Sequence, residues 1–263
     1  MVLWLLFFFV LALVLFMLFH LTGLSIWQAY FYIVAIELCI FITISIIRSY
    51  RMGQLLNEKC DPEKYLKKTL RQKAKLKHKP KLVAILTINE AAATMLLGDF
   101  QKAENILTGI DKEDLSDKNG SYFTYLINLI ICNYELGKIE EGDHMYEMQL
   151  PPLIISSKRN KITLQMLIGD RLFYKKQYEE SYQHMAKLMD IELNTRQQVE
   201  ILYRMAQIEA LKGDYGTAFK KYRKVAKHGN KLWIAHKSEE ILQEGVYQEY
   251  YNASSGMEKI KNS

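Results

Sequence analysis

Two long apolar stretches open the chain and set it apart from the mixed pattern that follows. Residues 2–19 contain no polar side chain, and residues 29–47 are nearly as apolar. The first stretch would extend about 27 Å as an α-helix, against about 30 Å for the hydrocarbon core of a bilayer. A cleaved signal peptide is the competing interpretation, but no basic residue precedes this stretch and no small-x-small cleavage pattern follows it. The pattern predicts a transmembrane helical hairpin over residues 1–47, turning at His20–Ile26.

The net charge of +6 is concentrated in one segment directly after the predicted hairpin. Residues 48–81 hold twelve Lys or Arg against three acidic residues, which gives +9, so the rest of the chain is slightly acidic. Cytosolic flanks of membrane helices carry the Lys/Arg excess, so both termini are expected on the cytosolic side of the cell membrane. A charge excess confined to one segment argues against a general nucleic-acid-binding surface.

Residues 48–80 are expected to form a basic juxtamembrane connector helix, with Pro62 at a helix start. Such a segment can lie on anionic lipid, at about 1 kcal/mol per nearby Lys or Arg. The alternative is a solvated helix whose charges only enforce the topology. The residues expected to face lipid are Arg48, Arg51, Lys67, Lys68, Arg71, Lys73 and Lys75.

Glu37 is the one acidic or basic residue within the two apolar stretches. A carboxyl group at this depth of a membrane is costly and often marks a functional position. One interpretation is a protonated carboxyl group that is hydrogen-bonded to backbone or to a second copy of the chain. The other is a contact with a partner protein. A proton pathway is not expected, because it would need more than one such residue.

From about residue 81 the sequence repeats a short phrase, at spacings of 39, 39 and 37 residues. The phrase places Gly before a polar residue and then an aromatic residue or Ile, with Lys176 replacing Gly in the third copy. Gly is expected to end one helix in the left-handed conformation. A small residue four positions after the polar residue of each phrase is expected to let the two helices approach closely. These small residues are Ala103, Gly142, Ser181 and Ala218. The flanking amphipathic stretches predict helices over 82–97, 121–136, 160–175 and 195–211 before the phrase, and over 100–109, 139–149, 178–189 and 215–227 after it.

These residues resemble the tetratricopeptide repeat (TPR), a helix–turn–helix unit of 34 residues. The fourth copy matches best, with Tyr203, Ala206, Gly213-Asp214-Tyr215, Ala218 and Tyr222. The units here are longer, and the second carries Ile130 where the family usually has a small residue. The resemblance implies an all-α fold of a bacterial-type TPR protein, in which a membrane hairpin is followed by an α-solenoid of about four helix pairs over residues 81–229.

The end of a solenoid needs a cap, because its last helix pair would otherwise expose apolar surface. Residues 230–253 are expected to supply a capping helix, with Trp233, Ile234, Ile241 and Leu242 on its apolar face. Residues 254–263 are expected to form a disordered tail.

The resemblance also implies a concave groove lined by the first helix of each pair. Chaperone-binding members of the family grip a C-terminal carboxylate with Lys, Arg and Asn, but the corresponding positions here hold Ile88, Ala92 and Ile131. An apolar groove suits an amphipathic helix or an extended apolar segment of a partner, unless neighbouring repeats or the capping helix fill it. The expected groove residues are Ile88, Met95, Ile127, Ile131, Tyr134, Met166, Phe173 and Tyr203.

No constellation of catalytic or metal-binding residues is evident in the sequence. The histidines are isolated, the three cysteines are scattered, and no Gly-rich phosphate loop occurs. We therefore expect no enzyme activity, cofactor, metal, small-molecule substrate or nucleic-acid partner. The leading hypothesis is a membrane-anchored TPR scaffold or adaptor that binds a protein partner at the cytosolic face. The alternatives are an accessory subunit assembled through the hairpin, and a regulatory sensor that responds to a peptide.

Overall fold

The computed structural model describes residues 2–21, 25–118, 120–151, 153 and 157–245, and every regular element within these ranges is a helix. The chain divides into two compact units, Met1–Gln54 and Leu55–Ser263. The expected all-α class is confirmed for the described part of the chain. The predicted tail, residues 254–263, and the last residues of the predicted capping helix lie outside the described residues.

The first unit contains α1 (Val2–Leu21) and most of α2 (Ile26–Asn57). Among the described residues, one helical segment, Tyr30–Asn57, is long and apolar enough to cross a membrane by its length and composition. The prediction that the second helix ends at Ile47 is wrong, because α2 continues to Asn57. The basic residues that follow Ile47 are good helix formers, and no proline interrupts the helix there.

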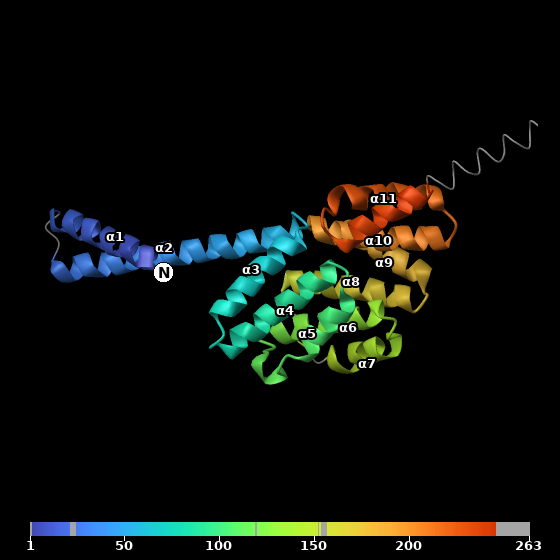
Figure 1. Ribbon diagram of the computed structural model, residues 1–263, viewed down its shortest axis with the longest axis horizontal. Coiled ribbons are helices and arrows are strands. Elements are labelled where there is room, and N and C mark those ends of the chain that lie inside the picture. The colour runs from blue at the N-terminus through green and yellow to red at the C-terminus, as the bar shows by residue number, and fades with distance from the viewer. Residues whose placement is uncertain (1, 22–24, 119, 152, 154–156, 246–263) are drawn as a thin grey trace, which may run out of the picture. The chain divides into compact units, whose positions relative to one another are not determined.

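Four helix pairs follow one another along the second unit (Figure 1). The first helices of successive pairs contact each other, so they lie side by side on one face of the unit. A short 3-10 helix, η1 (Lys112–Asp114), lies between the first two pairs. The pairs are α4 (Pro80–Leu96) with α5 (Phe100–Thr108), α6 (Ser121–Glu135) with α7 (Ile139–Gln149), α8 (Lys158–Tyr174) with α9 (Tyr178–Leu188), and α10 (Thr195–Leu211) with α11 (Tyr215–His228).

The turn inside each pair has the same backbone geometry. In the first pair, the Asp99 amide donates to the Thr94 carbonyl at 3.2 Å, and the Asp99 side chain caps α5 by accepting from the Lys102 amide. Both bonds satisfy backbone groups that a helix end leaves unpaired. The predicted left-handed residue is present in every pair. It is Gly98 (φ +89°), Gly137 (φ +76°), Lys176 (φ +62°) and Gly213 (φ +84°).

Each second helix carries a small residue where it packs against the first. A Cβ atom added to Gly142 would lie 2.6 Å from the Tyr134 ring, so no larger residue fits there. The equivalent residues Ala103, Ser181 and Ala218 are fully buried. This confirms the close approach of the two helices that the repeated phrase predicted.

Part of the predicted connector is integrated into the second unit. Helix α3 (Pro62–Lys75) packs along α4, and the Asp61 side chain caps its first turn. Cys60, with φ +49°, is fully buried in an apolar cluster that it shares with α10 and α11. We call residues 55–245, from the start of this unit to its last described residue, the array.

A further helix, residues 233–245, completes the array. Leu232 and Ile234 are buried with Tyr203 and Tyr222, and Ile241 and Leu242 pack against the same cluster. This helix therefore lies over the apolar surface of the last helix pair.

The first and last segments of the array contact each other directly, through what we call the end-to-end contact. Trp233 packs edge-on against Phe100, with 5.6 Å between the ring centroids. Three hydrogen bonds join residues distant in sequence: Lys231 N to Cys60 O at 3.1 Å, Asn230 Nδ2 to Lys59 O at 2.7 Å, and Thr195 Oγ1 to Glu58 Oε2 at 2.9 Å. The array is therefore closed on itself and is not an open row of helix pairs.

Candidate functional site: the inner cavity of the array

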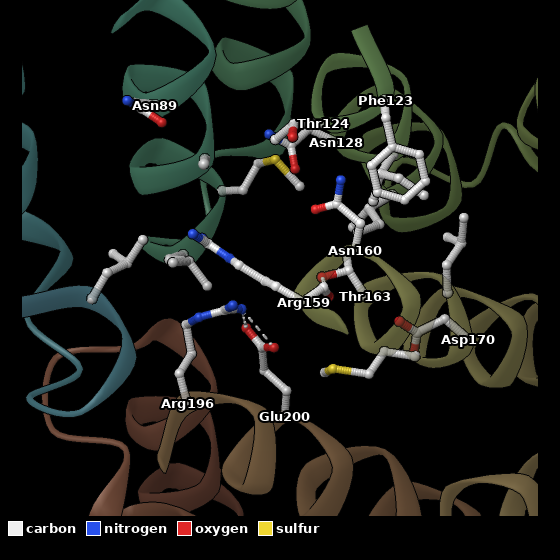
Figure 2. Close-up of a pocket in the computed structure, with 18 of the residues that line it drawn as sticks. Asn89, Phe123, Thr124, Asn128, Arg159, Asn160, Thr163, Asp170, Arg196 and Glu200 are labelled. Atoms are coloured by element: carbon white, nitrogen blue, oxygen red, sulfur yellow. Dashed lines mark hydrogen bonds and ion pairs between the residues drawn. The ribbon is translucent and has the colours of Figure 1, made fainter. Parts of the chain in front are cut away.

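The inner helices of the array surround a cavity of about 510 Å³ (Figure 2). Its walls come from α4, α6, α8 and α10, and Trp233 borders it from the C-terminal helix. On α8 the wall residues Arg159, Thr163, Met166 and Asp170 recur every three or four positions, which is one face of a helix. The volume lies within the range of about 300–1,000 Å³ that is usual for ligand pockets.

A buried arginine joins three inner helices at one end of the cavity. Arg204 on α10 binds Asp170 on α8 at 2.8 Å and Glu135 on α6 at 3.0 Å. Its guanidinium group also lies 4.4 Å from the Phe173 ring centroid and 4.9 Å from that of Tyr174. Burial raises the pKa of Asp170, although Arg204 opposes the shift. These ion pairs connect α6, α8 and α10. Because Arg204 is paired with two carboxylates, it is not available to bind a further anion.

Two further arginines, Arg159 and Arg196, line the cavity, and Figure 2 shows the Arg196 guanidinium group turned toward Glu200. Arg196 on α10 is held by Glu200, whose two carboxylate oxygens each accept a hydrogen bond at 2.8 Å. Arg159 on α8 is solvent-exposed, and no carboxylate pairs with it among the described residues. Burial of part of the side chain and repulsion by Arg196 both lower the pKa of Arg159. Arg159 is therefore a cation of the cavity wall that has no carboxylate partner in the described part of the chain.

Amide and hydroxyl side chains also line the cavity. Among them are Asn89, Thr124, Asn128, Asn160 and Thr163. The Nδ2 atom of Asn128 is buried and donates to no acceptor among the described residues. A buried donor without an acceptor costs about 1–3 kcal/mol. Side-chain amides carry both donors and an acceptor, so they complement the groups of a peptide backbone.

The structure brings half of the predicted groove residues to this cavity. Met95, Ile127, Ile131 and Met166 line it, whereas Ile88, Tyr134, Phe173 and Tyr203 do not. Tyr134 is 1% exposed, and its hydroxyl donates to Asp143 of α7 at 2.8 Å. Tyr203 is 5% exposed and packs against Tyr222 and Trp233. These rings are buried against other helices, so they stabilise the fold and do not form an accessible surface.

The predicted membrane and lipid residues occupy different environments. Glu37 is half-buried in α2, and its Oε1 atom has no hydrogen-bond partner within the described residues. Lys73 pairs with Glu90 of α4 at 2.7 Å, so it is engaged within the array. Lys68 is half-buried. The other residues predicted to face lipid are exposed: Arg48, Arg51, Lys67, Arg71 and Lys75.

The sequence places Asp170, Arg204 and Glu135 near the predicted groove, but it did not predict that Arg159 and Arg196 line the cavity. Arg159 lies just before the predicted helix start at residue 160, and Arg196 lies in the first turn of the helix predicted from residue 195. The available signal was the spacing of Arg159 to Thr163 and of Arg196 to Glu200, which places polar groups on the same helix face as the predicted apolar wall.

No protein-family model matches the chain, and comparisons with curated proteins and with solved structures find no match. The class of the protein is therefore defined by the structure of its described residues. These are all-helical, and they combine one helix that is long and apolar enough to cross a membrane with a closed array around a cavity. In the described ranges, no group of three or more His, Cys, Asp or Glu residues is arranged to hold a metal ion.

Proposed function

We propose that this protein is a membrane-anchored TPR-type scaffold whose cavity binds a segment of a protein partner at the cytosolic face of the membrane. In this proposal α1 and α2 form a transmembrane hairpin and the helix pairs form a TPR-like solenoid. No enzyme activity is proposed for it. The single observation that carries the binding function is the cavity of about 510 Å³ on the inner helices, with apolar and amide side chains in its walls.

The proposed anchor rests on the apolar composition of the first unit. Helix α1 is apolar, and Tyr30–Asn57 contains a stretch apolar enough to cross a membrane. The +9 segment that starts at Arg48 favours a cytosolic location for the array. The exposed basic residues of α3 would then add attraction to anionic lipid. A reporter enzyme fused after Ser263 tests the orientation, since activity only outside the cell would contradict it.

The composition of the cavity favours an extended protein segment over a small apolar molecule. Ile127, Ile131 and Met166 supply apolar wall area, and three asparagines supply backbone-like hydrogen-bonding groups beside it. Extended peptides are bound in this way, with main-chain hydrogen bonds for affinity and side-chain pockets for specificity.

Site-specific photocrosslinking in membranes tests the proposed function. A photoreactive phenylalanine analogue replaces Thr124, which lines the cavity and is exposed, or Met148 on α7, which is 64% exposed and lies outside the cavity. We expect one partner segment to crosslink from position 124 and not from position 148. A synthetic peptide of that segment should then block the crosslink. Crosslinks from position 148 alone would contradict binding in the cavity.

A second candidate function is that of an accessory subunit assembled through the first unit. The observation that favours it is the unpaired Oε1 atom of Glu37, because a carboxyl group within a membrane helix usually has a partner. Deleting residues 1–47 separates the two functions. A scaffold should still bind its partner through the array, whereas an accessory subunit should lose its complex.

A further inference from the structure

We infer that the segment bound in the cavity presents a carboxylate to Arg159, with Arg196 beside it. The inference rests on the proposed function, because it names the chemistry of the group that the same cavity receives. The residues differ from the groove positions at which the family resemblance placed a carboxylate clamp, Ile88, Ala92 and Ile131.

In the described ranges, no carboxylate of the cavity lining pairs with Arg159. Arg204 is shared between two carboxylates, and Arg196 is held by both oxygens of Glu200. Asp117 and Lys118 are exposed neighbours in one turn, so together they add no net charge to the lining. An anion placed next to Arg159 and Arg196 would relieve the repulsion between the two guanidinium groups.

A carboxylate fits this position better than a phosphate group does. The planar guanidinium group binds a carboxylate through two parallel hydrogen bonds, which gives both geometry and strength. One carboxylate matches the single charge of Arg159, whereas a phosphate monoester carries about −1.5 to −2 at neutral pH. The excess negative charge of a phosphate would lie near Glu200, which already occupies Arg196.

The other end of the cavity disfavours an anion and so sets the direction of the bound segment. Glu135 and Asp170 share a single cation there. Asp170 lies on α8 about 16 Å further along the helix than Arg159, from the rise per residue of an α-helix. The carboxylate is therefore directed to the Arg159 end, and Asn128 and Asn160 can bond the backbone of the segment.

The test uses the full-length chain in detergent micelles, with Trp4→Phe and Trp27→Phe, which leaves Trp233 at the cavity as the sole tryptophan. Trp233 fluorescence then reports binding of three pools of acetylated pentapeptides with mixed apolar flanks. The first has a central Asp and an amidated end, the second a central Asn and an amidated end, and the third a central Asn and a free terminal carboxylate.

We expect the Asp pool or the free-carboxylate pool to bind roughly tenfold to a hundredfold more tightly than the uncharged pool, the range for hydrogen bonds to a charged group. Which of the two binds more tightly tells whether a side chain or a chain end supplies the carboxylate. Arg159→Gln should abolish the preference, and Arg159→Lys should restore part of it. Lys158→Gln removes the same charge from an exposed side chain that pairs with Glu192, so it should change nothing.

Two results would overturn the inference while leaving the proposed function in place. One is equal binding of all three pools, and the other is a carboxylate preference that persists in Arg159→Gln. Binding by none of the pools would overturn the proposed segment binding together with the inference. Unchanged circular dichroism and melting of each variant show that the array is folded in these measurements.

Discussion

At the scale of single residues, Asp143 on α7 ties three helices together. Its carboxylate accepts from the Tyr134 hydroxyl on α6 at 2.8 Å, from Arg171 Nε on α8 at 2.8 Å, and from Nζ of Lys175, which caps the end of α8, at 2.9 Å. Burial raises the pKa of this carboxyl group, but the hydrogen bonds from Arg171, Lys175 and Tyr134 outweigh that effect and lower it to about 2. The ionised form is therefore the one that the fold stabilises.

The depressed pKa of Asp143 predicts a dependence of stability on acid. Its stabilising contribution is present above the unfolded pKa of 3.8 and is lost as the pH falls toward about 2. Asp143→Asn should lower the free energy of unfolding at pH 7 by about 2 kcal/mol, and the difference from wild type should shrink below pH 4. Urea denaturation at pH 7 and at pH 3 measures both values.

A matched control for this variant is Glu147→Gln on the same helix. Glu147 also pairs with Arg171, but its side chain is 59% exposed, so water screens the pair. We expect a much smaller change in the free energy of unfolding from Glu147→Gln. A loss in Asp143→Asn that is equally large at both pH values would show that ionisation of Asp143 is not the cause.

At the scale of helices, the contact between α10 and α11 depends on the small residue Ala218. Ala218 is fully buried, beside Tyr203 and Tyr222 in the same apolar cluster. Ala218→Trp should lower the free energy of unfolding by at least about 1–3 kcal/mol, because the added ring has no space between the helices. Thermal melting followed by circular dichroism measures the loss.

The control for Ala218→Trp adds the same ring elsewhere on α11. Lys220 is exposed, so Lys220→Trp should change the melting temperature little. Equal destabilisation by both substitutions would mean that Ala218 does not mark a close helix contact.

The helix pairs could be predicted closely from the sequence. All eight predicted helices of the pairs occur within two residues of their expected limits. The reason is local: a residue such as Gly213 ends one helix, and a cap such as Asp214 begins the next, within three residues. Signals of this kind need no knowledge of the tertiary structure.

The neighbours of each helix face were harder to predict. Helical periodicity places Tyr134 on an apolar face, but it cannot tell whether that face meets solvent or α7. The lining residue Arg159 was missed for a related reason, since a charged residue beside a helix start is ordinarily solvated. Only the packing of α8 and α10 shows that Arg159 and Arg196 line the same cavity.

At the scale of the whole molecule, the closure of the array had no counterpart in the sequence pattern. Glu58 and Thr195 are 137 positions apart, and each lies outside the repeated phrases. A periodic sequence specifies how each helix pair stacks on the next, but the curvature that brings the ends together accumulates over all the pairs. Asn230 forms part of the end-to-end contact, but in the sequence alone it cannot be told from an ordinary helix-cap residue.

The end-to-end contact changes how the array is expected to come apart. In an open stack of repeats the terminal units have one neighbour each, so they fray before the centre does. Here the first and last segments each gain a second neighbour, because Trp233 packs on Phe100 and the Lys231 amide donates to the Cys60 carbonyl.

Hydrogen exchange should therefore find α3 and α11 opening with free energies close to that of the centre of the array. Trp233→Ala should restore fraying at both ends together. Protection that already declines toward the ends in the wild type would contradict this. If the ends are protected in this way, the array should exchange its amides as one cooperative unit, and binding in its cavity should change the exchange at both ends.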